Sequence, residues 1–173
     1  MSLDERAAAP TAVRRTLSRL ARWIKALDSE IAGLLARITM QIEQTALALL
    51  EQYGVGADSA AVLLVTAGDN PDRLTNEAAF AALCGVSPVE MSSGKTSRRR
   101  LNRGGDRQAN AALFRVVMTR LRDEPRTRAY LTRRTTEDRT KREIMRCLKR
   151  FLARDLFRII HAALMPATPM ITT

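Results

Sequence analysis

Residues 17–38 read LSRLARWIKALDSEIAGLLARI, and this stretch carries the strongest structural signal in the chain. Apolar residues recur in it at alternating intervals of three and four, which places them along one side of an α-helix in the spacing of a coiled-coil seam. The repeat therefore predicts a long N-terminal helical arm. Two interpretations of the seam stay open, pairing with another helix or packing against the chain's own domain. The seam residues are Leu17, Leu20, Ile24, Leu27, Ile31, Leu34 and Ile38.

The rest of the chain also reads as helices, because no segment alternates apolar and polar residues as a strand would. We expect Gly54 to end the first helix and Asn76 and Asp106 to cap two later ones. Pro125 is expected to interrupt the helix that Asp106 caps. The sequence predicts an all-α fold, with a long coiled-coil-like arm and a compact helical domain. The expected limits are 1–52 for the arm, 53–164 for the domain and 165–173 for a loosely ordered tail.

The last helix is predicted to start at Thr135 or Thr136. Its expected apolar face is Ile144, Leu148, Phe151, Leu152, Leu156, Ile159 and Ile160. A basic stripe on the opposite side extends the positive surface of the chain, or is simply solvated. The stripe consists of Arg142, Arg146, Lys149, Arg150 and Arg154.

Composition narrows the class of partner. The chain has 173 residues, a formal net charge of +11 and a pI near 11.0, which favours nucleic acid or an anionic membrane surface as partner. No apolar run reaches the ~18 residues that a membrane span requires. Aromatic residues make up only 4%, which argues against a base-stacking platform. Isolated Cys84 and Cys147 indicate reduced thiols in a cytoplasmic protein, and a single histidine, His161, argues against zinc.

The most basic segment is SSGKTSRRRLNRGGDR, residues 92–107, with six cations and one carboxylate. Cations packed this closely repel one another unless a polyanion lies among them, and glycines let backbone amides approach it. A phosphate backbone is the polyanion that fits best. The candidate nucleic-acid-binding residues of this segment are Ser92, Gly94, Lys95, Arg98, Arg99, Arg100, Arg103 and Arg107.

A second candidate contact lies at Gly54-Val55-Gly56, followed by the small residue Ala60. The pattern matches a helix-hairpin-helix element, in which two glycines form a tight turn whose amides face a phosphate. The other interpretation is an ordinary turn between helices. As a phosphate contact, the turn would position a nucleic acid without reading its sequence.

The acidic residues are scattered and form no compelling metal-binding set, so we expect no metal site and no cofactor in this chain. A covalent route stays open, since a serine can attack a phosphodiester when cations neutralise the developing charge. Ser93, between Ser92 and Gly94, is the candidate nucleophile. Alternatively, both serines only bind a phosphate or cap the loop.

The combination of SSG, RLNRGG, RQxN and RCLKR motifs resembles the C-terminal domain of the IS110/IS116/IS902 family of bacterial transposases. The resemblance covers residues 50–160. It implies a recombinase guided by a structured RNA, whose N-terminal RuvC-like half carries a DEDD magnesium site. It also implies that Ser93 is the catalytic serine, acting through a phosphoserine link, and that this chain alone is inactive.

Two positions depart from the family pattern: Asp106 replaces an Asn, and Glu137-Asp138-Arg139 replaces Glu-Gly-Lys. The first change favours a helix cap over a phosphate contact, and the second changes the turn before the last helix. The expected function is DNA binding and donation of Ser93 in transposition, with DNA, a guide RNA and further copies of the chain as partners. The alternatives are a non-catalytic helix-hairpin-helix nucleic-acid-binding module and a coiled-coil assembly protein.

Overall fold

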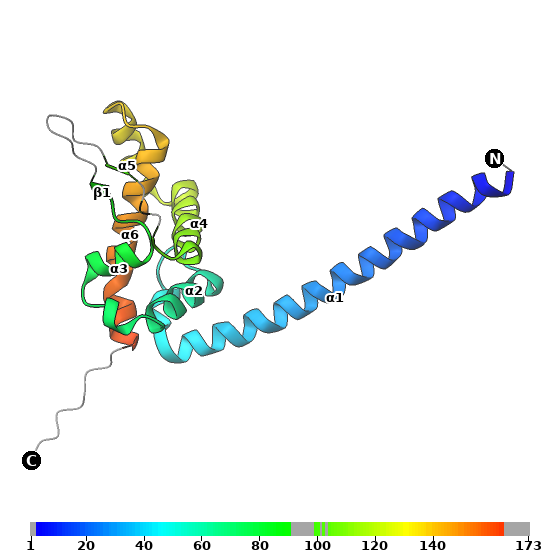
Figure 1. Cartoon of the computed structure of the whole chain (residues 1–173), viewed down its shortest axis with the longest axis horizontal. Helices are drawn as coiled ribbons and strands as arrows, with labels where there is room; N and C mark the ends of the chain where they lie inside the picture. The colour runs from blue at the N-terminus through cyan, green and yellow to red at the C-terminus, as the bar shows by residue number, and fades with distance from the viewer. Residues whose placement is uncertain (1–2, 91–98, 101, 103, 165–173) are drawn as a thin grey trace, which may run out of the picture. The chain divides into compact units, whose positions relative to one another are not determined.

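The computed structural model describes residues 3–90, 99–100, 102 and 104–164 (Figure 1). The chain divides into two compact units, residues 1–39 and 40–173. This division falls before the expected arm boundary at residue 52, because the last turns of the first helix belong to the second unit. The limits expected for the arm, the domain and the tail stay predictions.

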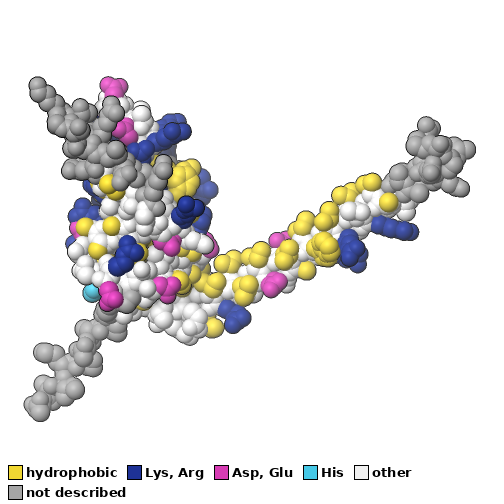
Figure 2. Space-filling model, in the orientation of Figure 1, with side chains coloured by type: hydrophobic (Ala, Val, Ile, Leu, Met, Phe, Trp, Pro, Cys, Tyr) yellow, Lys and Arg dark blue, Asp and Glu magenta, His cyan; other side chains and the backbone are white. Residues whose placement is uncertain are grey.

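The first unit consists of the greater part of α1, which spans Leu3–Leu50. Within this unit the six seam residues from Leu17 to Leu34 are 45–61% exposed. Figure 2 shows the corresponding row of hydrophobic side chains along the helix. The guanidinium of Arg19 lies 5.1 Å from the ring centroid of Trp23, beside the seam. The long helix predicted from the apolar repeat is confirmed.

The end of α1 belongs to the core of the second unit. Ile42, Ala46 and Leu49 are buried there, and the non-helical backbone of Ala46 kinks the helix. The chain then turns at Gly54, whose φ of +77° is a conformation that favours glycine. A Cβ on Gly54 would lie 3.4 Å from Thr119 and from the carbonyl of Val116, so the turn packs directly on a later helix.

The described residues of the second unit form five further α-helices, namely α2 (Ala57–Gly68), α3 (Glu77–Leu83), α4 (Arg107–Asp123), α5 (Pro125–Thr136) and α6 (Lys141–Leu164). Helix α6 contacts α2, α3, α4 and α5, so most of the core lies along it. A single 3₁₀ turn, η1 (Pro71–Arg73), precedes α3. The largest buried side chains include Phe80, Leu63, Leu113, Leu156 and Ile160. The all-α class is confirmed.

Two very short strands are the exception to the helical structure among the described residues. Val89–Glu90 (β1) pairs antiparallel with Arg99–Arg100 (β2), and Val89 lies opposite Arg100. The pairing was not predicted, because two residues are too few for a visible alternation. It pairs the residues directly before 91–98 with those directly after it.

The predicted helix starts at Asn76 and Asp106 are confirmed. The side chain of Asn76 accepts a hydrogen bond from Ala79 N at 2.9 Å, and that of Asp106 accepts one from Ala109 N at 2.7 Å. Pro125 is the first residue of α5, where its missing N–H costs no helical hydrogen bond. These caps fix where α3 and α4 begin.

The predicted start of the last helix at Thr135 or Thr136 is wrong. Those residues end α5, and Asp138 then adopts a φ of +56°. Helix α6 begins after Thr140, which exchanges hydrogen bonds with Glu143 in a capping box: Thr140 N donates to the carboxylate at 2.9 Å and Glu143 N donates to the hydroxyl at 3.3 Å. The left-handed residue makes the turn that separates the two helices.

The buried face of α6 is rotated slightly from the one predicted. Ile144, Leu152, Leu156 and Ile160 are buried as expected, whereas Phe151 is 40% exposed. Among the described residues, no helix is both long enough and apolar enough to cross a membrane.

We predict that Asp138→Gly stabilises the chain. A side chain costs roughly 1 kcal/mol in the left-handed conformation, and glycine removes that cost. Asp138→Gly should therefore raise the free energy of unfolding by up to about 1 kcal/mol, measured by urea denaturation. Asp138→Asn, which tolerates the same φ, is the matched control and should change little. A gain of stability with Asp138→Ala as large as with glycine would contradict the argument.

Candidate nucleic-acid interface

The candidate interface is built on a close backbone contact between Gly85 and Gly105. Gly85 ends the turn after α3 with a φ of +67°. A Cβ on Gly105 would overlap the backbone N and Cα of Gly85 and lie 2.9 Å from the carbonyl oxygen of Ala82. Only a glycine at position 105 lets the end of the basic segment lie against the end of α3.

Hydrogen bonds from the basic segment saturate the carbonyl groups at the end of α3. Asp106 N donates to Leu83 O at 2.7 Å, and Asn102 Nδ2 donates to Ala82 O at 3.1 Å. Asn110 Nδ2, from the first turn of α4, reaches both Cys84 O at 3.0 Å and Gly85 O at 3.1 Å. The last carbonyls of a helix lack partners within the helix, so the backbone N–H of Asp106 and the side chain of Asn102 supply them, while Asn110 bonds two carbonyls of the turn that follows.

Lys149 on α6 completes this network. Its Nζ donates to Asn110 Oδ1 at 2.7 Å, and the residue is only 8% exposed. Burial lowers the pKa of the ammonium, and nearby Arg146 lowers it further. Lys149 was expected on the basic stripe opposite the apolar face of the last helix, and its burial corrects this assignment. We call Gly85, Gly105, Asn102, Asn110 and Lys149 the α3 clamp.

The thiol of Cys84 lies inside the clamp region and is unreactive. Burial and then the charge of Asp106 raise the pKa of Cys84 to about 12. A thiol with that pKa is almost entirely protonated near neutral pH, and the thiolate is the reactive form. Cys84 is therefore a packing residue and no candidate nucleophile.

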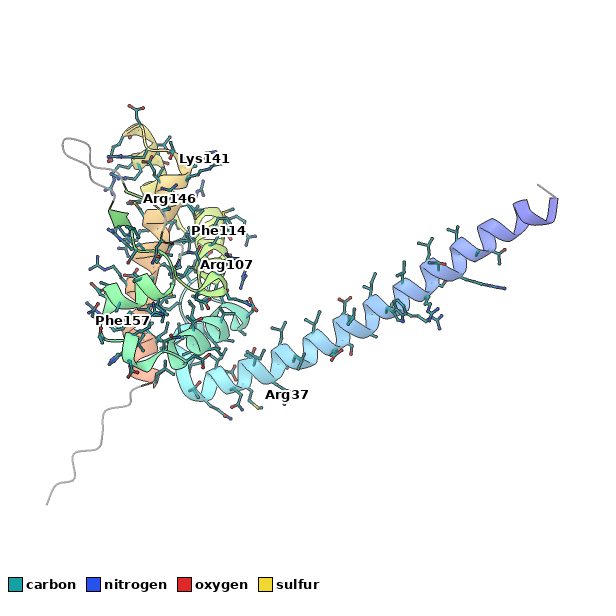
Figure 3. All side chains as sticks on the ribbon, viewed as in Figure 1. Arg37, Arg107, Phe114, Lys141, Arg146 and Phe157 are labelled. Carbon is teal, nitrogen blue, oxygen red and sulfur yellow. The ribbon has the colours of Figure 1, made fainter. Side chains whose placement is uncertain are left out.

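Several predicted site residues lie outside the described residues, namely Ser92, Ser93, Gly94, Lys95, Arg98 and Arg103. The backbone of Arg99 and Arg100 forms β2. Arg107 is exposed at the first residue of α4, immediately after the capping residue Asp106 (Figure 3). The α3 clamp and the β1–β2 pair thus hold the chain on both sides of the segment that carries Ser93.

The glycine turn and Arg107 lie at different places along α4. Gly54 packs beside Val116 and Thr119, whereas Arg107 begins the helix. Twelve residues separate Arg107 from Thr119, which corresponds to about 18 Å along the helix axis. The two predicted contacts are therefore not brought together at one point. The helix-hairpin-helix assignment itself stays a prediction.

Two arginines of α4 bond to the turn between α1 and α2 and to the start of α2. Arg120 Nε donates to Tyr53 O at 2.9 Å, and Arg115 pairs with Asp58 at 2.6 Å. Arg154, like Lys149 a residue of the predicted basic stripe on α6, also bonds within the domain, because its Nε donates to Glu77 at 2.9 Å. Part of the positive charge of the chain therefore takes part in hydrogen bonds and ion pairs within the domain.

The acidic and thiol groups do not gather in the part of the chain that the structure describes. No group of three His, Cys, Asp or Glu side chains there could hold a metal ion.

Comparison with known proteins assigns the chain to a family. Residues 46–132 match the Transposase IS116/IS110/IS902 family. The chain belongs to this family. The matched range contains the whole α3 clamp except Lys149, together with both glycines of the α1–α2 turn.

Two family relatives are similar over most of this chain. A 43.6 kDa protein of insertion element IS110 from Streptomyces coelicolor is 31% identical over 145 residues, covering 82% of this chain and 36% of the relative. A 42 kDa protein of insertion element IS900 from Mycobacterium paratuberculosis is 27% identical over 157 residues, covering 88% of this chain and 39% of the relative. The chain thus spans somewhat more than a third of the length of these relatives.

The clamp residues Asn102, Asn110 and Lys149 were not recognised as a unit from the sequence. A signal was present, because Asn110 ends the RQxN motif and Lys149 lies in RCLKR, two of the motifs that carry the family resemblance. Their contact across 39 positions of sequence could not be derived from spacing alone.

We predict that Gly105→Ala disrupts the clamp and that Gly104→Ala does not. The new methyl at position 105 overlaps the backbone of Gly85, whereas at position 104 the nearest atom is Asn102 Oδ1 at 3.5 Å. Overpacking of this kind costs roughly 1–3 kcal/mol, while neutral surface changes stay within about 0.5 kcal/mol. Denaturant unfolding of both variants measures the difference, and equal losses would show that the glycine contact carries no special weight.

Proposed function

We propose that this chain is the DNA-binding C-terminal domain of an insertion-sequence transposase and that Ser93 is its nucleophile. Family membership supports the first part, together with a net charge of +11. The single observation that carries the proposal is the α3 clamp, because a basic loop that only needed solvation would not be bonded to the end of α3 through Asn102 and Asp106.

The proposed step is a transesterification at phosphorus. The Oγ of Ser93 forms a bond to phosphorus while a bond from phosphorus to a deoxyribose oxygen breaks, and that oxygen takes up a proton as it leaves. Lys95, Arg98, Arg99 and Arg100 stabilise the extra negative charge on the phosphoryl oxygens. No histidine lies near Ser93 in the sequence, so the serine proton passes to water or to a group on another domain.

The remaining candidate residues hold the nucleic acid. Ser92, Gly94, Arg103 and Arg107 contact phosphates around the scissile bond in this proposal. The amides at Gly54 and Gly56 contact a second phosphate further along, since the turn lies about 18 Å from Arg107 along α4. A magnesium-binding RuvC-like half and a structured guide RNA are proposed from the family resemblance, and the chain alone is proposed to be inactive.

Substitution of Ser93 tests the catalytic part. In a complete transposase that carries this domain, Ser93→Ala should abolish recombination and the covalent protein–DNA adduct on a nicked substrate, because the attacking oxygen is gone. DNA affinity should remain within a few fold. Ser92→Ala is the matched control and should retain the adduct. Normal recombination by Ser93→Ala would leave the non-catalytic nucleic-acid-binding module as the function.

We also propose that α1 associates with α1 of further copies of the chain. The support is the row of exposed seam residues, which a helix in water normally buries. Trp23 lies next to the seam and is the only tryptophan, so its fluorescence reports the assembly.

A charge placed in the seam tests this association. Ile24→Glu with Ile31→Glu should convert an oligomer to a monomer in sedimentation and shift Trp23 emission to longer wavelength, because a buried carboxylate without a partner opposes association. Ser29→Glu with Ala36→Glu adds the same charge on the opposite side of the helix and should leave the oligomer intact. A parent chain that is monomeric at high concentration would contradict the association.

A further inference from the structure

The helical pair α5–α6 carries a concentration of cations apart from the 92–107 segment. Residues 125–150 contain ten Lys and Arg against three Asp and Glu. Figure 2 shows dark blue side chains gathered toward this end of the second unit. Two of the acids are already engaged, Glu137 by Arg133 and Arg134, and Glu143 by Arg139. A surplus of positive charge remains on the surface of the pair.

Two aromatic rings organise part of this charge. Tyr130 on α5 and Phe151 on α6 meet edge to face, with centroids 5.9 Å apart. The guanidiniums of Arg133 and Arg134 lie 5.3 and 6.0 Å from the Tyr130 ring, and that of Arg150 lies 5.8 Å from the Phe151 ring. Stacking on rings holds a guanidinium in place while its edges stay available to an acceptor. We call these five residues the arginine–aromatic cluster.

Some donors of the cluster have no acceptor. The Nε atoms of Arg134 and Arg150 are buried and have no hydrogen-bond partner within the part of the chain that the structure describes. Because these Nε atoms are shielded from solvent, an acceptor from outside must be reached by the Nη groups of the two guanidiniums. Glu137 is the only carboxylate among the described residues that pairs with the cluster, and it offsets one of the three cations.

Further cations extend the cluster along α6. Arg142 and Arg146 precede Arg150 at intervals of four residues, which places all three on one face of the helix. Arg142 and Arg146 are exposed and form no ion pair with the described acids. Arg126, one turn before Tyr130, extends the cluster along α5 and is also exposed. A ligand that matches this row needs negative charges repeated along its length.

We propose that the arginine–aromatic cluster binds the phosphodiester backbone of a nucleic acid, at a site separate from the 92–107 segment. Arginine suits this ligand because its planar fork donates to two phosphate oxygens at once. The row at 142, 146 and 150 then follows consecutive phosphates of the strand. This inference rests on the proposed nucleic-acid binding and adds a second surface to it. DNA and RNA present the same phosphate chemistry, and the experiment separates them.

Fluorescence anisotropy of the full chain with a DNA duplex and, in a second arm, an RNA duplex measures affinity across a salt series. Each phosphate contact contributes about 0.9 to the slope of log affinity against log salt on duplex DNA. Arg134→Gln with Arg150→Gln should therefore lower the slope by about 1.8 in at least one arm. The arm with the larger loss identifies the strand that the cluster binds.

Two further variants and a folding measurement distinguish direct contact with a phosphate from a general effect of positive charge. Arg128→Gln with Arg158→Gln removes the same charge from exposed positions outside the cluster and should change the slope by less than half as much. Arg134→Lys with Arg150→Lys keeps the charge but loses the fork and the ring stacking, and should still weaken binding. Circular dichroism verifies that each variant is folded, and the lysine variant serves if the glutamine variant is not.

The outcomes distinguish this inference from the proposed function. Equal effects of the cluster pair and the control pair in both arms, or full affinity of the lysine variant, would overturn the cluster as a phosphate site. In that case the triple change Arg98→Ala, Arg99→Ala and Arg100→Ala should still flatten the slope by about two to three. A parent chain that binds neither duplex would overturn the proposed function as well.

Discussion

The contact between Gly85 and Gly105 is the constraint on which the arrangement of the second unit depends. The two backbones approach there so closely that a Cβ on Gly105 would overlap Gly85, and Gly85 itself has the positive φ that favours glycine. Around this contact, Asn102, Asp106 and Asn110 bond the carbonyls that end α3, and Lys149 bonds Asn110 from α6. The same few atoms therefore close α3, start α4 and anchor α6.

The helices and most of their ends could be predicted from the sequence, because the relevant signals are local. The apolar repeat of α1, the capping side chains of Asn76 and Asp106, and Pro125 each act within a few residues of their own position. The start of α6 was misplaced because two threonines at 135–136 resemble a cap. The true cap, Thr140 with Glu143, follows a left-handed Asp138 that spacing alone did not reveal.

The site was harder to predict, because its polar contacts join distant parts of the chain. Lys149 was assigned to the basic stripe opposite the apolar face of α6. Its position nevertheless fits the buried register of Leu152, Leu156 and Ile160, at intervals of three and four residues. A lysine in an apolar register is a sign of a buried polar partner, here the Asn110 amide. The residues of segment 92–107 that carry the proposed chemistry lie mostly outside the described residues.

The position of Lys149 next to Arg150 in α6 has a thermodynamic consequence. One residue reaches inward to the α3 clamp, and its neighbour stacks on Phe151 in the arginine–aromatic cluster. Because both side chains belong to one turn of a rigid helix, a ligand that displaces this turn changes the Lys149–Asn110 contact as well. If both proposed surfaces bind nucleic acid, their binding free energies are then linked, and by reciprocity binding at one changes the affinity at the other by the same factor.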